Sequence, residues 1–133
     1  MKLRLAQPIS QEALDQSQGE YSEQCRVLGL DDKMVGLLIL AFNEVGTYVM
    51  EHSYSNWFEA EIDLEDGRAG LTFRDDGEAF DSVEAIGLFD VPVPEIDRHM
   101  GLYMLGRRPF EKRYRRLDGR INEFVLRQPE TEA

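Results

Sequence analysis

The sequence predicts an α+β two-layer sandwich, in which a mixed, mostly antiparallel sheet carries helices packed on one of its faces. Three observations lead to this prediction. Two helical segments stand near the start of the chain, strand-like stretches alternate apolar and polar residues, and most of those stretches are grouped in hairpins. Hairpin strands form antiparallel sheets, and helices outside the hairpins are free to cover one face.

Two helices are predicted from apolar spacing and capping residues. The first begins at Pro8 to Ser10 and ends near Gly29. Its expected helical pattern comprises Ala13, Leu14, Ser17, Tyr21 and Val27. The second is capped by Asp31 or Asp32 and ends near residues 52–55. Its expected core stripe comprises Met34, Leu37, Leu38, Ala41, Phe42, Val45 and Val49.

Five strands are predicted, four of them in two hairpins. Alternation over residues 2–6 indicates a short edge strand. Alternation over residues 57–64 and 69–74 indicates a hairpin around Asp66-Gly67, because glycine accepts positive φ freely at such a turn. Residues 112–116 and 121–127 form a second hairpin around Asp118-Gly119. Between the hairpins, we expect a loop or lid over residues 77–97 and a short helix over residues 98–108.

The length of 133 residues predicts one domain over residues 1–127, followed by a frayed polar tail over residues 128–133. A net charge of -11 argues against a nucleic-acid binder, since phosphate contacts need clustered Lys and Arg. Basic residues do gather over residues 98–127, either as a solvated strand face or as a patch for phosphates or an acidic partner. We expect a cytoplasmic protein that does not span a membrane. The sequence has one cysteine, shows no basic-then-apolar leader, and has no apolar run that approaches the roughly 18 residues of a membrane span.

Three constellations have the residue types that a nucleotide site needs. Glu44, Tyr48 and His52 share one stripe of the second helix, which is either a functional stripe or a helix edge at the surface. Asp75 ends a strand, where its carboxylate can accept a hydrogen bond from an exocyclic amine, while Gly77 lets backbone approach a flat ligand. Asp-Asp-Gly is also a common turn.

The third constellation is the segment that begins at His99 and Met100. Gly101 can open a helix there and expose backbone N–H groups to phosphate, with help from the helix dipole. A plain helix start is the alternative interpretation of the same residues.

The order and spacing of these features resemble the histidine-kinase-like ATPases, also called GHKL or Bergerat-fold proteins, in the branch of the anti-sigma-factor serine kinases. Residues 42–54 resemble the family's first box. Residues 71–81 resemble the strand and Asp-x-Gly box that binds adenine, and residues 100–105 resemble the glycine-led helix near the phosphates. The similarity covers nearly the whole chain, from residue 2 to residue 127, and the Asp-x-Gly box is its most specific part.

The resemblance implies ATP with magnesium as cofactors, and transfer of the γ-phosphate to a serine of an antagonist protein. It also implies a sigma factor as the alternative partner, and often a homodimer. Residue by residue, Glu44 matches the carboxylate that activates the attacking hydroxyl, and Asp75 matches the acid that reads adenine. Gly77 matches the close-approach glycine, and Gly101 matches the second glycine of the phosphate-side box.

Three positions depart from the family pattern. Tyr48 stands where the family has a magnesium-holding Asn, and a neutral phenol is a poor ligand for a small cation that demands tight octahedral geometry. Ala79 replaces the second glycine of the adenine box, and His99 stands where the phosphate-side box begins with Gly. Two hypotheses follow, a working serine kinase and a binding module that keeps the fold and the partner surface without fast catalysis.

Overall fold

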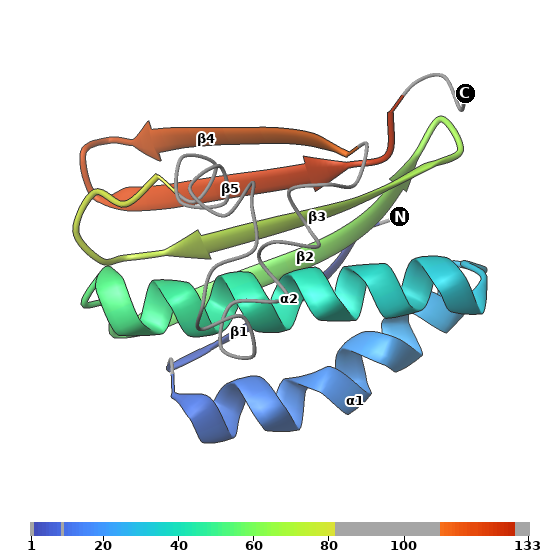
Figure 1. Ribbon diagram of the computed structural model, residues 1–133, viewed down its shortest axis with the longest axis horizontal. Coiled ribbons are helices and arrows are strands. Elements are labelled where there is room, and N and C mark those ends of the chain that lie inside the picture. The colour runs from blue at the N-terminus through green and yellow to red at the C-terminus, as the bar shows by residue number, and fades with distance from the viewer. Residues whose placement is uncertain (1, 9, 82–109, 130–133) are drawn as a thin grey trace, which may run out of the picture.

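The computed structural model of the chain describes residues 2–8, 10–81 and 110–129. A sheet of five strands forms one layer, and two helices lie together on one side of it (Figure 1). This arrangement confirms the predicted α+β class with helices on one face. The sheet differs from the prediction in being antiparallel at every described strand pair rather than mixed.

The antiparallel order follows from how the helices return the chain. Strand β1 (Lys2–Pro8) leads into α1 (Gln11–Val27), and α2 (Asp32–His52) then runs back beside α1. The pair of helices therefore brings the chain back to the end where β1 finished. Strand β2 (Trp57–Glu65) starts there, with Trp57 opposite Pro8, and runs antiparallel to β1.

Helix α1 begins and ends as predicted, but one residue of its expected pattern does not join its buried face. Ser10 caps the helix, its Oγ accepting a hydrogen bond from the Ala13 N–H at 3.0 Å, and Gly29 follows with φ of 80°. Val27 is 62% exposed, and Cys25 is buried instead. Residues 14, 17, 21 and 25 keep the spacing of one helical face, which Val27 leaves.

Helix α2 supplies the largest share of the core. Its N-cap is Asp31, which accepts a hydrogen bond from the Met34 N–H at 2.8 Å. The Phe42 ring stacks on Tyr21 of α1 at 4.6 Å between centroids and lies 6.1 Å from Phe73 of the sheet. By length and composition α2 also passes a test for a membrane span. Its buried stripe against the sheet is what the core helix of a globular domain shows.

The remaining strands confirm both predicted hairpins. Strand β3 (Arg68–Asp75) follows β2, and β4 (Glu111–Leu117) is followed by β5 (Ile121–Arg127), in the sheet order β1-β2-β3-β5-β4. The turn residues Asp66 and Gly67 have φ of 52° and 76°, and Asp118 and Gly119 have φ of 51° and 65°. Positive φ at both turn positions matches the twist of a tight hairpin.

The two faces of the sheet differ in chemistry. The side toward the helices is apolar along most of its length, with Phe58 stacked on Phe73 at 5.4 Å and Phe124 opposite Phe73. The other side carries ion pairs, such as those of Arg74 with Glu59 and Glu123. Gln128, the first residue of the expected tail, is held to β3 through Ala69 by two hydrogen bonds of 3.0 and 2.8 Å.

Candidate functional site

Asp75 is a charged residue on the helix-facing side of the sheet, which is apolar along most of its length. It is the last residue of β3, lies opposite Asn122 of β5, and is 1% exposed. Three donors converge on its Oδ1 atom: Gly77 N at 2.9 Å, Ser53 Oγ at 3.0 Å and Asn122 Nδ2 at 3.1 Å. They come from the loop after β3, the end of α2 and the neighbouring strand, so tertiary structure assembles the group.

The ionised form of Asp75 is held by neutral donors rather than by a bonded cation. Burial raises the pKa of the Asp75 carboxyl, the hydrogen bonds from Gly77, Asn122 and Ser53 oppose that rise, and the nearby Asp76 adds to it. All three donors meet Oδ1, so Oδ2 accepts no hydrogen bond from the described residues. An N–H donor on a ligand would find its acceptor in Oδ2.

The sequence predicts that Gly77 lets backbone approach a flat ligand, and in this structure the close neighbour of Gly77 is the chain itself, at Ser53. A Cβ built on Gly77 would collide with the Ser53 carbonyl oxygen and lie 2.6 Å from Ser53 Oγ. The next residue, Glu78, donates its N–H to that same carbonyl at 2.7 Å. The glycine is therefore required for packing the loop after β3 against the end of α2.

Asp76 has a role that the sequence prediction missed. Its Oδ1 accepts hydrogen bonds from Asn56 N at 2.9 Å and Trp57 N at 3.0 Å, and these bonds tie the α2–β2 connection to the loop after β3. Ala79, the expected second position of the adenine box, is exposed. The Asp-Asp-Gly segment thus fixes two connections while it presents Asp75 inward.

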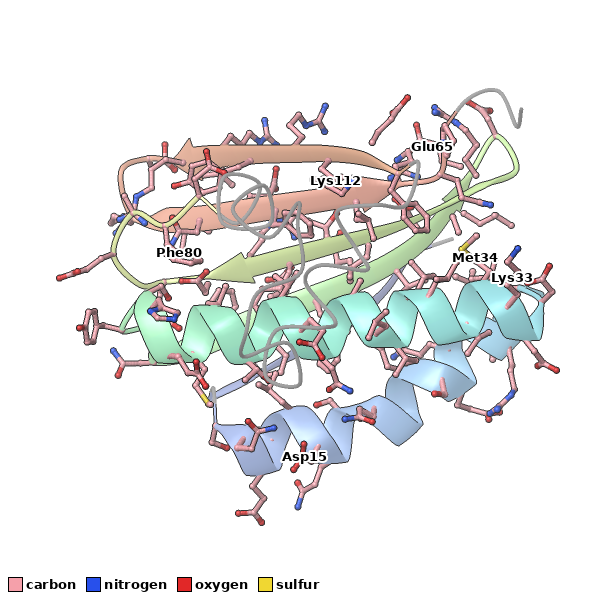
Figure 2. The ribbon with its side chains drawn as sticks, in the orientation of Figure 1. Asp15, Lys33, Met34, Glu65, Phe80 and Lys112 are labelled. Atoms are coloured by element: carbon pink, nitrogen blue, oxygen red, sulfur yellow. The ribbon has the colours of Figure 1, made fainter. Side chains whose placement is uncertain are left out.

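The end of α2 lies against the same loop. His52 stacks on Phe80 with ring centroids 5.9 Å apart and planes 8° from parallel, and Figure 2 shows Phe80 beside the C-terminal end of α2. The C-terminal end of the predicted α2 stripe, at His52, therefore lies against the segment that follows Asp75. Glu44 is half-buried on the same stripe, two turns before His52 and about 12 Å from it along the helix axis.

The structure thus brings Asp75 and Gly77 together and places His52 against Phe80 of the loop that follows them. Glu44 lies two turns earlier on α2. The side chain of Tyr48, and the predicted residues His99 and Gly101, lie outside the described part of the chain. Within the described part, no group of three or more His, Cys, Asp or Glu residues could hold a metal ion.

Part of the predicted basic region lies at the same end of the sheet. Arg116 of β4 donates to the Gly77 carbonyl oxygen at 2.8 Å and to the Gly119 carbonyl oxygen at 3.0 Å. An open hollow of about 490 Å³ adjoins it. The hollow is lined by Asp76, Arg116, Gly119, Arg120 and Ile121. The guanidinium groups of Arg116 and Arg120 therefore border the loop that follows Asp75.

The residue that sequence reasoning missed altogether is Asn122. It is the polar residue on the inward side of β5, where Phe124 and Leu126 are both buried. A polar residue that breaks an apolar alternation is the signal that could have found it. Its partner was hidden, because Asp75 is 47 positions away in the chain.

The chain matches no protein-family model and no curated protein.

Proposed function

We propose that this chain is an ATP-binding regulatory domain with the Bergerat fold, acting as a serine/threonine kinase of the anti-sigma-factor type in bacterial partner switching. The observation that supports the proposal is the Asp75 carboxylate, which is buried at a strand end. Three donors fix its Oδ1, and none of the described residues donates to its Oδ2. The order of elements and the α2 stripe agree with the resemblance.

The proposed roles divide between recognition and phosphoryl transfer. Asp75 Oδ2 accepts the exocyclic amine of adenine, a hydrogen bond to a buried charged group that strongly disfavours bases lacking that donor. Glu44 on α2 is the base that accepts the proton of the attacking serine hydroxyl. ATP supplies the phosphoryl group when it is bound, and catalysis of such a transfer rests on positioning and charge neutralisation. The proposed partners are a sigma factor and an anti-anti-sigma protein in the cytoplasm, with a homodimer as the proposed assembly.

A second function is favoured by a specific observation. Asp76 and Gly77 are used by the chain's own backbone at Asn56, Trp57 and Ser53, and Tyr48 replaces the family's magnesium ligand. The same fold then serves as a non-enzymatic module that binds a sigma factor or an anti-anti-sigma partner without magnesium-dependent catalysis.

Calorimetric titration of ATP tests the proposed adenine contact, with Asp75→Asn as the test variant and Asp76→Asn as its matched control. Each variant removes one charge of the same motif and keeps an Oδ1 acceptor for the backbone donors. We expect Asp75→Asn to weaken ATP binding at least about tenfold, because an amide nitrogen at the Oδ2 position cannot accept from an amine. Asp76→Asn should bind like the parent. Equal affinity of both variants would remove Asp75 from the site.

Magnesium separates the two candidate functions. The same titration is run with magnesium and with a chelator, using Tyr48→Asn beside the parent. ATP affinity that rises at least about tenfold with magnesium supports the kinase, since magnesium links nucleotide phosphates to the protein in such sites. Binding without a magnesium effect supports the module. Absence of ATP binding by the parent and by Tyr48→Asn under both conditions rejects the proposed nucleotide site.

A further inference from the structure

Asn122 makes more side-chain hydrogen bonds than Asp75 does, although it is only 4% exposed. Its Nδ2 donates to Asp75 Oδ1 at 3.1 Å and to the Glu78 carbonyl oxygen at 2.7 Å. Its Oδ1 accepts from Phe80 N at 3.1 Å, Tyr114 OH at 2.8 Å and Arg116 Nη1 at 3.0 Å. One buried amide therefore connects β3, β4 and the loop after β3.

The partners fix which way the amide of Asn122 is turned. The backbone N–H of Phe80 and the guanidinium of Arg116 can only donate, so the atom that faces them must be the oxygen. The Glu78 carbonyl can only accept, so the atom that faces it must be the nitrogen. The nitrogen is consequently directed at Asp75, where it favours a carboxylate over a carboxylic acid.

We infer that Asn122 is the positioning residue of this site: its amide holds the Asp75 carboxylate in the ionised state with Oδ2 available, and latches residues 78–80 to β5. The part of this inference that concerns a ligand rests on the proposed function. The part that concerns the carboxylate and the latch rests only on the contacts of Asn122.

Only an amide satisfies all of these neighbours. A hydroxyl side chain carries a single hydrogen and cannot donate to Asp75 and Glu78 together. A carboxylate at position 122 would keep the bonds from Phe80, Tyr114 and Arg116 but would set a second negative oxygen against Asp75. Two carboxylates that share a site cannot both ionise easily, so a proton would bind to the pair.

The charged and titratable groups around Asp75 act in both directions. Those of the surrounding elements are His52 on α2, Asp76 and Glu78 on the loop, and Tyr114 and Arg116 on β4. Asp76 opposes ionisation of Asp75. Arg116 donates to the Asn122 oxygen, and the nitrogen of the same amide donates to Asp75. Asn122 bonds to both Arg116 and Asp75, so replacing it removes the link between these two residues.

The test is a titration of the Asp75 carboxyl carbon by ¹³C NMR in the ligand-free protein. Asn122→Asp is the test variant, and Tyr114→Phe is the matched control because it removes another bond of Asn122 without touching Asp75. Asp75→Asn identifies the resonance. We expect the titration midpoint of Asp75 to rise by about one unit or more in Asn122→Asp, a tenfold change in proton affinity, and to change much less in Tyr114→Phe. An unchanged midpoint in Asn122→Asp overturns the inference.

A second measurement needs no variant and follows the side-chain amide protons of Asn122 in the parent protein by NMR. The two protons should exchange slowly with solvent and shift with pH at the same midpoint as Asp75, because one of them is bonded to that carboxylate. Fast exchange, or a shift that does not follow Asp75, overturns the inference even where Asn122→Asp fails to fold.

Titration of ATP into the same proteins separates this inference from the proposed function. If the parent binds ATP, we expect Asn122→Asp to bind at least about tenfold more weakly at neutral pH. A raised midpoint in a parent that binds no ATP leaves Asn122 as the positioning residue and rejects the nucleotide. ATP binding that Asn122→Asp leaves unchanged rejects the positioning role and leaves the nucleotide.

Discussion

Two buried carboxylates, Asp75 and Glu123, lie on opposite faces of neighbouring strands and are stabilised in opposite ways. Glu123 of β5 is 2% exposed and accepts from Arg74 Nε at 2.8 Å and from Arg115 Nε. Asp75 of β3 is 1% exposed, and among the described residues its donors are a hydroxyl, a backbone N–H and an amide. Arg74 and Asp75 are adjacent in β3, yet they belong to two different environments. Arg74 neutralises the buried carboxylate of Glu123, whereas the buried carboxylate of Asp75 is held by neutral donors.

The difference shows in the directions of the two pKa values. Burial by itself raises the pKa of Glu123, but the hydrogen bonds and charges of Arg115 and Arg74 outweigh it, and the pKa falls below its ordinary value. Burial prevails at Asp75, whose pKa is raised. Both oxygens of Glu123 are bonded to guanidinium groups. A carboxylate paired with guanidinium groups is neutralised and serves the stability of the fold. A carboxylate held by neutral donors is not neutralised, so its charge can act on a ligand.

Gly77→Ala is the change with the largest expected effect, and it should damage the Asp75 side alone. The added Cβ collides with the Ser53 backbone, which cannot move without shifting the end of α2, so we expect a loss of about 3 kcal/mol in the free energy of unfolding. Gly36→Ala is the control, because nothing lies within 4 Å of its Cβ, and it should stabilise α2 by up to about 1 kcal/mol. Urea unfolding measures both. Similar midpoints for the two variants would contradict the packing described for Gly77.

Glu123→Gln should have the next largest effect, on the opposite face. It removes the charge that faces Arg74 and Arg115, at an expected cost of about 2 kcal/mol at neutral pH. The native pKa of Glu123 lies below its ordinary 4.5, so its contribution is present above that pH and is lost as the pH falls through the native value. The gap between parent and variant should therefore close in acid.

Glu65→Gln is the control for Glu123→Gln. Glu65 is a glutamate of the same face whose side chain is 62% exposed and lies 3.9 Å from Arg127, and Figure 2 shows it at the end of the sheet away from Phe80. Exposed pairs of this kind contribute little, so unfolding should change by less than about 0.5 kcal/mol. A loss for Glu65→Gln as large as that for Glu123→Gln would remove the distinction between buried and exposed pairs on this face.

Asp75→Asn should change stability less than Gly77→Ala or Glu123→Gln does, and in the opposite direction. The native pKa of Asp75 is raised above 3.8, so the carboxyl contributes stability below that pH that is lost as the pH rises through the native value. Removing the charge should leave the protein as stable as the parent, or more stable by up to about 1 kcal/mol, at neutral pH. Thermal unfolding across pH 3 to 7 checks this. A large loss at neutral pH would mean that the Asp75 charge serves the framework after all.

The sequence determined the elements because their signals are local. Asp-Gly at residues 66–67 and 118–119 sets two hairpins through the backbone freedom of adjacent residues. The apolar stripe of α2 sets one buried helix through spacing within residues 34–49. The prediction failed where the geometry was not local. Val27 satisfied the apolar pattern of α1 but left its buried face, and the sheet is antiparallel where a mixed one was predicted.

The tertiary structure alone decided what surrounds Asp75. The residue type and the strand end were legible in the sequence, but Ser53 lies 22 positions before it and Asn122 lies 47 after it. Strand order sets the second contact, because β5 pairs with β3 although β4 comes between them in the chain. Local sequence patterns predict which face of a helix or strand a residue lies on. The donors that stabilise a buried carboxylate are those that the whole fold brings within about 3 Å of it.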